Sequence, residues 1–373
     1  MSRASGAARV SRWLPAAVIP AVIVAGAVIA PLGASAAVDL PDIGAAELFE
    51  LVSTSDADAF SARIEQKSEL GLPDLSGAIG PGASGSEPGI ASVLELVTGS
   101  HSARVFVDGP DRARMQLLDQ LAERNIVRNG DEVWLYDSSD RTATHLVFPA
   151  DFGDRADEAI PDAGAVPTPG ELADRVLAEL DATTAVTVGT DATVAGRSAY
   201  ELVLTSRDTR TLVGSVSIAV DSETGLPLAF EILARGQDVP ALRVAFTELK
   251  LERPDADLFA FEPPPGTTVT ERTVTEHTVT EHTVTEGPKA DHGTTDAPGY
   301  TVSGVGWSSI LELPAAELPA DLLDSPLYAA ATEPVNGGRL LSTALVNVLM
   351  TDDGRVFAGA VSPEQLLDAA AGR

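Results

Sequence analysis

Five histidines are the side chains of this chain best suited to acid–base chemistry near neutral pH. His101 and His145 fall within expected strands, where a hydrogen-bonded structural role is the more common one. The sequence contains no Gly-x-Ser-x-Gly elbow, His-Glu-x-x-His pair or phosphate-binding loop. No pair of carboxylates stands out among the 55 acidic residues. We therefore expect no catalytic residue and no cofactor; the alternative is a hydrolase that depends on His101 or His145.

The other three histidines, His277, His282 and His292, lie in or beside a short repeat rich in Thr, Val and Glu. Glu276 and Glu281 stand next to two of them, so this segment could bind Zn²⁺ or Cu²⁺ weakly. We expect no metal site, because metal binding would have to order a flexible segment. The chain has no cysteine, which excludes disulfides, thiol catalysis, cysteine-ligated zinc and a lipidated cysteine.

The charge balance restricts the partners further. The formal net charge is −30, from 25 basic and 55 acidic residues. Such a chain is a poor match for nucleic acid, whose phosphates require basic surfaces, and for an anionic lipid surface. Hydrophobic residues make up 44% of the chain and aromatic residues only 5%, so a large core must consist mostly of aliphatic side chains.

Residues 1–37 have the three parts of a secretory signal peptide. Three arginines and no acid precede Trp13, an apolar run extends to Leu32, and Ala34-Ser35-Ala36 offers a small-x-small cleavage site. We expect export to a periplasm-like space, to the outer face of the cytoplasmic membrane, or to the medium. An uncleaved membrane anchor is the alternative, since the apolar run is long enough to span a bilayer.

Residues 38–263 indicate one β-rich domain of about ten strands, mostly linked by hairpins. The clearest turns are Asn129-Gly130 and Asp221 to Gly225. Strands and helices do not alternate along the chain, which excludes a parallel βαβ order. We expect an α+β fold, namely a curled antiparallel half-barrel covered by helices.

One helix is expected from Pro169 to Leu180, where Thr168 and Glu171 form a capping box and Pro169 suits the first helical position. One face of this helix is apolar and would serve as a lid over the sheet; it carries Leu172, Val176 and Leu180.

The concave face of such a sheet would form an apolar cavity under the helix. Trp134 and Tyr136 point to one face of their strand, because alternate residues of a strand share a face. That face either lines the cavity or is ordinary core. Further candidates for the cavity lining are Phe106, Leu117, Phe148, Ile218, Phe230 and Phe246.

Two segments follow this domain. Residues 264–298 contain four copies of Thr-Val-Thr-Glu with a period of five, which matches neither the helical nor the strand period, so we expect a flexible linker. Residues 299–373 are expected to form a C-terminal β-hairpin plus helix segment. Its hairpin runs from Leu340 to Val361 and turns at Thr351 to Gly354, and its helix starts at Ser362.

Four motifs resemble those of the LolA-like lipoprotein carriers and the related RseB/MucB sigma-factor regulators. They are Asp108 to Arg114 with its turn proline, Val127 to Asp137 with its Trp-x-Tyr strand, Asp221 to Pro227, and Phe259 to Gly266. They occur in the order of the family. The hairpin from Leu340 to Val361 resembles a tail of actinobacterial members.

This resemblance implies a half-open antiparallel barrel with a helical lid that holds acyl chains and has no catalytic activity. The carriers commonly have a basic residue before the turn proline that helps to hold the lid, and this chain has Gly109 there. The first hypothesis is thus a carrier or sensor of lipid or acylated lipoprotein in the cell envelope. The alternative is an RseB-like regulator that binds the extracytoplasmic domain of a membrane anti-sigma factor.

Overall fold

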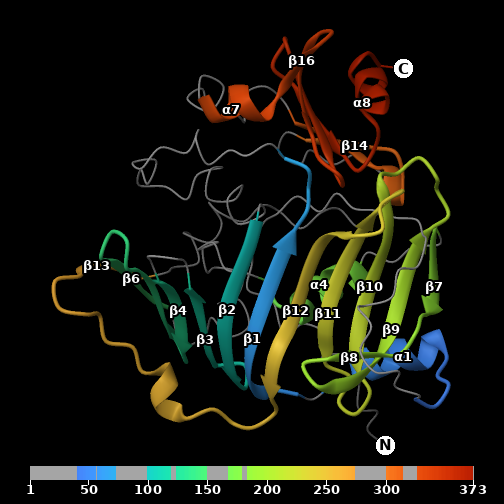
Figure 1. The fold of residues 1–373 in the computed structure, drawn as a ribbon. Helices are drawn as coiled ribbons and strands as arrows, with labels where there is room; N and C mark the ends of the chain where they lie inside the picture. Colours follow the sequence, from blue (N-terminus) through green and yellow to red (C-terminus); the bar gives the residue numbers. More distant parts are fainter. Residues whose placement is uncertain are drawn as a thin grey trace, which may run out of the picture.

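The structure is a computed structural model that describes residues 40–55, 57–72, 99–118, 123–148, 167–178, 183–273, 300–313 and 326–372. Its strands form two sheets, a large one of 13 strands and a small C-terminal one of 6 strands. Figure 1 shows the large sheet from its β13 edge to its β7 edge, with the small sheet at one end of its strands. The expected signal peptide lies outside the described residues.

The large sheet has the order β13-β6-β5-β4-β3-β2-β1-β12-β11-β10-β9-β7, and β8 also pairs with β9. Its strands are β1 (Ala59–Ser68), β2 (Gly99–Asp108), β3 (Arg112–Leu118), β4 (Glu123–Asn129), β5 (Glu132–Asp137), β6 (Thr142–Val147), β7 (Thr184–Val188), β8 (Ala192–Val194), β9 (Arg197–Ser206), β10 (Val213–Asp221), β11 (Pro227–Ala234), β12 (Pro240–Lys250) and β13 (Thr268–Thr273).

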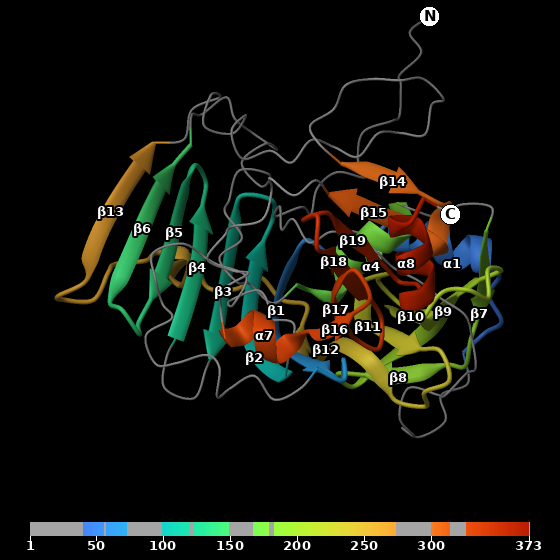
Figure 2. The same ribbon diagram turned by 90° about the horizontal axis from the view of Figure 1, so that it is seen from above.

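The expected fold class is confirmed. Antiparallel hairpins build two groups of strands, β2–β6 and β9–β12, and β1 joins them by pairing with both β2 and β12. The sheet is curved and not closed, because β13 and β7 at its two ends do not pair with each other (Figure 2). It is a mixed sheet, since β13 pairs with β6 in parallel.

Strand β13 lies inside the segment expected to be a flexible linker. The structure differs from that expectation for Thr268–Thr273, which form the edge strand, whereas residues 274–298 lie outside the described residues. Side-chain periodicity did not indicate this strand, because an exposed edge strand needs only backbone hydrogen bonds and no apolar face.

The hairpin turn between β4 and β5 lies one residue later than expected. Asn129 pairs with Glu132, so the two residues in the turn are Gly130 and Asp131. Gly130 has a φ of 63°, the left-handed conformation that favours glycine. The glycine therefore fixes the turn, as the sequence indicated, and the asparagine still belongs to the strand.

Two helices pack on the large sheet. Helix α1 (Ala45–Ser53) contacts β7 and β9, and helix α4 (Pro169–Ala178) contacts β11 and β12. The expected capping box of α4 is present: the Thr168 amide donates to Glu171 Oε2 at 2.6 Å, and the Glu171 amide donates to Thr168 Oγ1 at 3.2 Å. None of the helices in the described ranges has the length and apolar character needed to cross a bilayer.

The C-terminal unit consists of β14 (Thr301–Ser303), β15 (Ile310–Leu313), β16 (Glu333–Val335), β17 (Gly338–Ser342), β18 (Asn347–Thr351) and β19 (Val356–Gly359), with helices α7 (Pro326–Ala331) and α8 (Pro363–Ala370). Helix α8 starts with the expected capping box of Ser362 and Gln365. The expected long strand from Leu340 to Met350 is two strands, because Thr343 bonds Val346 and reverses the chain.

The large sheet and the C-terminal unit meet at the turn between β9 and β10. The Leu212 amide donates to the Ala360 carbonyl at 2.7 Å, and Thr211 forms a β-bridge with Val361. Trp307, from a 3₁₀ turn (η3, Gly306–Ser308), is buried and donates from Nε1 to Thr184 Oγ1 at 2.6 Å. Trp307 also joins the apolar cluster of the large sheet, so the units share one core.

Candidate binding faces of the large sheet

Strand register assigns each candidate side chain to a face of the sheet, because directly opposed residues of neighbouring strands point the same way. Ile218 of β10 lies opposite Leu202 of β9 on one side and opposite Phe230 of β11 on the other. Phe230 in turn lies opposite Val244 of β12. These four side chains therefore lie in one row on one face. Because α1 and α4 pack against this face, we call it the helix-covered face.

The helix-covered face is tightly packed where the helices lie on it. Leu172, Val176 and Leu177 of α4 pack against a cluster that contains Ile218 and Phe230. Ile218 is 0% exposed and Phe230 is 1% exposed, so both side chains are enclosed by protein. Protein side chains fill the region under the described part of α4. Leu180 of the expected lid lies outside the described residues.

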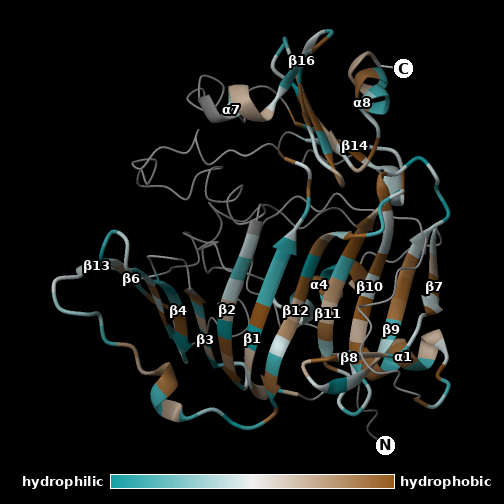
Figure 3. Cartoon of the chain, in the orientation of Figure 1, coloured by the Kyte–Doolittle hydropathy of each residue, from teal (hydrophilic) through white to brown (hydrophobic). Residues whose placement is uncertain are grey.

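The same face continues across the middle of the sheet. Phe246 of β12 opposes Ile64 of β1, Ile64 opposes Ala103 of β2, and Ala103 opposes Leu117 of β3. All four are buried in a second apolar cluster, to which α4 contributes Leu172. These two rows of buried apolar side chains extend from β9 to β3 on the helix-covered face, and Figure 3 shows that β9 and β10 consist largely of hydrophobic residues.

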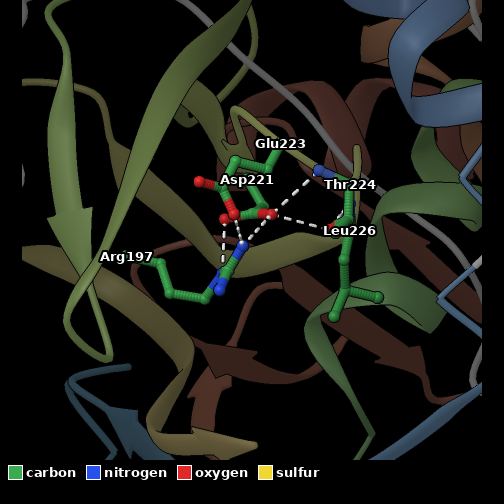
Figure 4. Close-up of polar contacts among 5 residues, drawn as sticks. All are labelled: Arg197, Asp221, Glu223, Thr224 and Leu226. Carbon is green, nitrogen blue, oxygen red and sulfur yellow. Dashed lines mark hydrogen bonds and ion pairs between the residues drawn. The ribbon is translucent and has the colours of Figure 1, made fainter. Parts of the chain in front are cut away.

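The hairpin between β10 and β11 holds α1 against this face. Asp221, 1% exposed, accepts hydrogen bonds from Arg197 Nε at 2.7 Å and Nη2 at 2.8 Å, and from Thr224 Oγ1 at 2.6 Å (Figure 4). Burial opposes ionisation of Asp221, but these hydrogen bonds outweigh it and lower its pKa. Gly225 has a φ of 73°, and a Cβ there would lie 2.1 Å from the Leu51 carbonyl oxygen of α1. The motif from Asp221 to Pro227 is thus structural.

Comparisons with known proteins show what this chain resembles. Residues 95–273 match the MucB/RseB N-terminal domain. All four motifs on which the sequence resemblance depends lie inside the matched range, so the resemblance is confirmed. The match supports a binding protein or regulator of the cell envelope. A comparison with curated proteins gave no match.

Solved structures similar to this chain include MucB and a LolA-superfamily protein. The crystal structure of MucB in complex with MucA(peri) is 17% identical, covers 87% of this chain and 97% of that chain, and has a TM-score of 0.41. The Pseudomonas aeruginosa MucA/MucB complex is 17% identical over 87% and 96%, with a TM-score of 0.39. The LolA-superfamily protein from Nitrosomonas europaea is 12% identical over 59% and 99%, with a TM-score of 0.24.

The opposite face of the MucB/RseB-like region carries an aromatic cluster. Trp134 of β5 stacks on His145 of β6, with ring centroids 4.1 Å apart and an interplanar angle of 8°. Phe261 lies 5.6 Å from Trp134 and 5.7 Å from Tyr136. The His145 Nε2 atom is 3.5 Å from the Glu132 carboxylate. We call Trp134, Tyr136, His145 and Phe261 the aromatic cluster. It holds the His145 ring by stacking, whereas among the described residues the hydrogen bond expected for a structural histidine is absent at the buried Nε2 atom.

The segment after β12 docks against this cluster in the MucB/RseB-like region. Arg114 Nη1 donates to the Leu258 carbonyl at 3.0 Å, and Phe259, in the 3₁₀ turn η2 (Ala256–Phe259), is 1% exposed. The Arg112 guanidinium lies 5.8 Å from the centroid of the Phe259 ring. Sequence reasoning identified Phe259 to Gly266 as a family motif but did not indicate what it packs against. Its two phenylalanines, spaced by one residue before a run of prolines, are the signal that could have indicated docking.

The structure divides the predicted cavity residues between the two faces. Leu117, Ile218, Phe230 and Phe246 are on the helix-covered face, whereas Phe106 opposes Arg114 and so shares the opposite face with Trp134 and Tyr136. Phe148 is buried just after β6. A single cavity cannot be lined by both groups, because the sheet separates them.

The two strand histidines are likewise apart. His101 is in β2 and His145 is in β6, with β3, β4 and β5 between them, which is a separation of roughly 19 Å at the usual strand spacing. Among the described residues, no group of three or more His, Cys, Asp or Glu side chains is placed to hold a metal ion. Nothing in the described residues therefore assembles a hydrolytic site from these two histidines.

Buried acids occur in the packed half of the sheet. Glu201 of β9 is 2% exposed, and desolvation raises its pKa despite hydrogen bonds from Ser217 and the Thr190 amide. Glu231 of β11 forms an ion pair with Arg243, but burial still raises its pKa. Burial likewise raises the pKa of Glu171 in the α4 capping box. The folded protein therefore holds protons on these carboxyls at a higher pH than an unfolded chain would.

Proposed function

We propose that the mature chain is an exported, non-catalytic regulator that binds the extracytoplasmic part of a membrane-anchored protein. The observation that carries the proposal is a MucB/RseB-like region whose helix-covered face is already filled by protein. Ile218 and Phe230 are at most 1% exposed. A carrier that exchanges acyl chains under α4 would have to displace this core, whereas a regulator can use the outer surfaces of the same scaffold.

The partner class follows from the relatives. MucB forms a complex with MucA(peri) in a solved structure, and the sequence resemblance implies an anti-sigma factor with a single membrane span as the partner. Export of this chain is needed for such an encounter. It is supported by the arginine-rich start, apolar run and Ala34-Ser35-Ala36 site at the N-terminus. No catalytic step is part of the proposal.

Affinity capture tests this function. The chain from residue 38 onward is immobilised and exposed to detergent-solubilised membranes of the source cell, and bound proteins are identified by mass spectrometry. We expect a protein with one membrane span to be retained. The matched control is an unrelated exported protein of similar negative net charge, because a strongly negative charge alone attracts basic proteins. Equal retention by both baits, or no membrane protein on either, would contradict the proposal.

A second candidate function is binding of an acyl chain from a lipid or lipoprotein. It is favoured by the second apolar cluster of the same face, where the half-buried Met115 packs beside the buried Val105 and Leu117. A row of aliphatic side chains of this kind suits hydrocarbon. The acyl chain would then modulate the first function, and added lipid would weaken capture of the membrane protein.

The lipid candidate has its own test. An organic extract of the purified mature chain is analysed by mass spectrometry, and uptake of a fluorescent fatty acid is measured. Met115→Gln places a polar group among the apolar side chains of the middle strands and should lower uptake several-fold. Arg104→Gln is the control, since Arg104 is exposed on the opposite face. An extract free of lipid together with equal uptake by both variants would rule out this candidate.

A further inference from the structure

Strand β13 occupies an unusual place in the large sheet. Among the described strands of that sheet, it alone pairs in parallel with its neighbour, running beside β6 from Thr268 opposite Thr142 to Thr273 opposite Val147. Figure 2 shows it at the outer end of the sheet, next to β6. Without β13, the edge of β6 would present unpaired backbone N–H and C=O groups.

Backbone hydrogen bonds hold β13 in this place. The Thr268 amide donates to the Arg141 carbonyl at 2.9 Å as the strand begins. All six side chains of β13 are exposed, and Val269 is 42% exposed. Within the described part of the chain, these side chains are not engaged in hydrogen bonds or ion pairs. The contacts that hold this strand are therefore those of an extended backbone, and its exposed side chains give little means of selecting one register.

The sequence supplies further segments that fit the same site. Residues 268–273 read Thr-Val-Thr-Glu-Arg-Thr, and residues 273–278 and 278–283 both read Thr-Val-Thr-Glu-His-Thr. These three segments differ only at the fifth position, where Arg272 is exposed. The fourth copy reads Thr-Val-Thr-Glu-Gly-Pro, and its Pro288 would stand where Thr273 now pairs with Val147. Proline lacks the N–H of a ladder residue, so the fourth copy is a poorer fit.

We propose that the edge of β6 is a docking site for one Thr-Val-Thr-Glu repeat, and that the first three repeats of the chain are interchangeable occupants. A slip of one residue would move every side chain to the other face of the sheet. A slip of five residues instead places the same residue type at each of the first four positions. Val274 or Val279 then takes the place of Val269 beside Ala143, and Glu276 or Glu281 takes the place of Glu271 beside His145.

The exchange changes the length of the connection on each side of β13. Upstream, the chain is fixed at Phe259 and Phe261, and a shift to the second or third repeat lengthens the segment between Phe261 and the strand. A longer surface loop closes at little entropic cost. Downstream, each shift removes five residues from the connection to β14, which shortens its greatest reach by roughly 17 Å. The docking site therefore sets the length of chain that joins the two sheets.

Cysteine trapping tests the proposal in the full mature chain, which has no native cysteine. Thr142→Cys on β6 is combined in turn with Thr268→Cys, Thr273→Cys or Thr278→Cys, which occupy the first position of repeats one, two and three. Disulfide formation in a glutathione buffer is followed by non-reducing electrophoresis and peptide mass spectrometry. We expect all three pairs to form a disulfide within one chain, at rates within about ten-fold of each other.

Val274→Cys combined with Thr142→Cys is the matched control. Val274 is the next residue after Thr273, so chance collisions with the cysteine at position 142 should be equally frequent for both. When the second repeat is docked, however, the side chain of residue 274 points to the face of the sheet opposite to that of residue 142. We expect it to react at least ten-fold more slowly than Thr273→Cys. Equal rates would indicate random collisions and overturn the proposal, as would trapping of Thr268→Cys alone.

A second variant separates exchange within a chain from exchange between chains. Val269→Pro with Thr270→Pro prevents the first repeat from forming a ladder, since one of the two amides must face β6. Trapping of Thr273→Cys should then rise at least two-fold and remain within one chain. An unchanged yield would overturn the exchange of repeats. Disulfides that join two chains would show that a repeat from a second copy of the protein occupies the edge of β6. That result would overturn the proposal that the repeats of the same chain occupy it.

Discussion

The two halves of the large sheet differ in how they are buried. In the packed half, strands β7 and β9–β12, all eight residues of β11 are buried, and α1 and α4 lie on one face. In the outer half, β2–β6 with β13, the strands are partly exposed and all six residues of β13 face solvent. Aliphatic side chains dominate the first half, and the aromatic cluster belongs to the second.

This difference indicates a division of labour within one sheet. A strand buried along its whole length contributes to stability and tolerates little change, because each side chain has neighbours on all sides. A partly exposed strand with aromatic rings and an open edge can exchange its contacts, as binding surfaces do. We infer that the packed half holds the fold and that the outer half is the more adaptable part. The following substitutions test that contrast.

The largest effect is expected from the packed half. Phe230→Ala removes a ring that is 1% exposed in the row under α4. It should lower the free energy of unfolding by about 4 kcal/mol, because the substitution removes the buried contacts of the ring and leaves a cavity in the core. Chemical denaturation measures this change. Phe49→Ala, at a ring that is 40% exposed on α1, is the control and should cost far less; equal losses would contradict the packing described.

The next effect concerns the hairpin that holds α1. Asp221→Asn should cost about 3 kcal/mol, because it leaves Arg197 without its buried partner. The pKa of Asp221 is lowered in the folded state, so its contribution is present above the ordinary value of 3.8 and is lost as the pH falls through the folded pKa.

Denaturation of the wild type and of Asp221→Asn at several pH values checks this prediction. The two proteins should differ most near neutral pH and converge in acid. Glu223→Gln is the matched control: Glu223 also accepts a hydrogen bond from Arg197, but its side chain is 78% exposed, so the loss should be under about 1 kcal/mol. A constant difference between wild type and Asp221→Asn at all pH values would refute the assignment.

In the outer half we expect a smaller and more local effect. Phe261→Ala removes the ring that contacts Trp134 and Tyr136 and should cost about 1.5 kcal/mol. The fluorescence of Trp134 should shift to longer wavelength as its ring becomes more exposed. Hydrogen exchange should increase at residues 256–261 and on β4 and β5, with little change on β9–β12. An equal increase throughout the sheet would show that the two halves are not distinct.

The smallest effect tests the buried acids. The pKa of Glu201 is raised in the folded state, so the folded protein binds more protons than the unfolded chain between the two pKa values. Stability must therefore fall as the pH rises through that interval. Glu201→Gln removes this dependence and should change stability by about 1 kcal/mol or less. Thermal unfolding from pH 4 to pH 8 measures the slope, and the exposed Glu252→Gln should leave it unchanged.

Local chemistry explains which elements the sequence predicted correctly. The capping boxes at Thr168 and Ser362 and the turn at Asp221 to Gly225 depend on residues three or four apart, so they can be recognised without knowing the fold. Helix α4 is described to Ala178, and the last two residues of the expected helix lie outside the described residues.

The division of the candidate site could not be predicted in the same way. Alternation shows that Trp134 and Tyr136 share a face, but not that Phe230 lies on the other one. That relation depends on the register of every ladder from β5 to β11, which is set by contacts between residues far apart in the sequence. Similarly, nothing near Trp134 in the sequence indicates Phe261 as its neighbour.

Strand β13 also bears on where this protein can be shortened. A fragment that stops at residue 263, the domain limit expected from the sequence, would lack the six residues that pair with β6. Its outermost strand would then offer an open ladder to any other extended chain in solution. Such a fragment should self-associate more strongly than a fragment ending after Thr273, because both lack the C-terminal unit but only the shorter one leaves the outer edge of β6 unpaired.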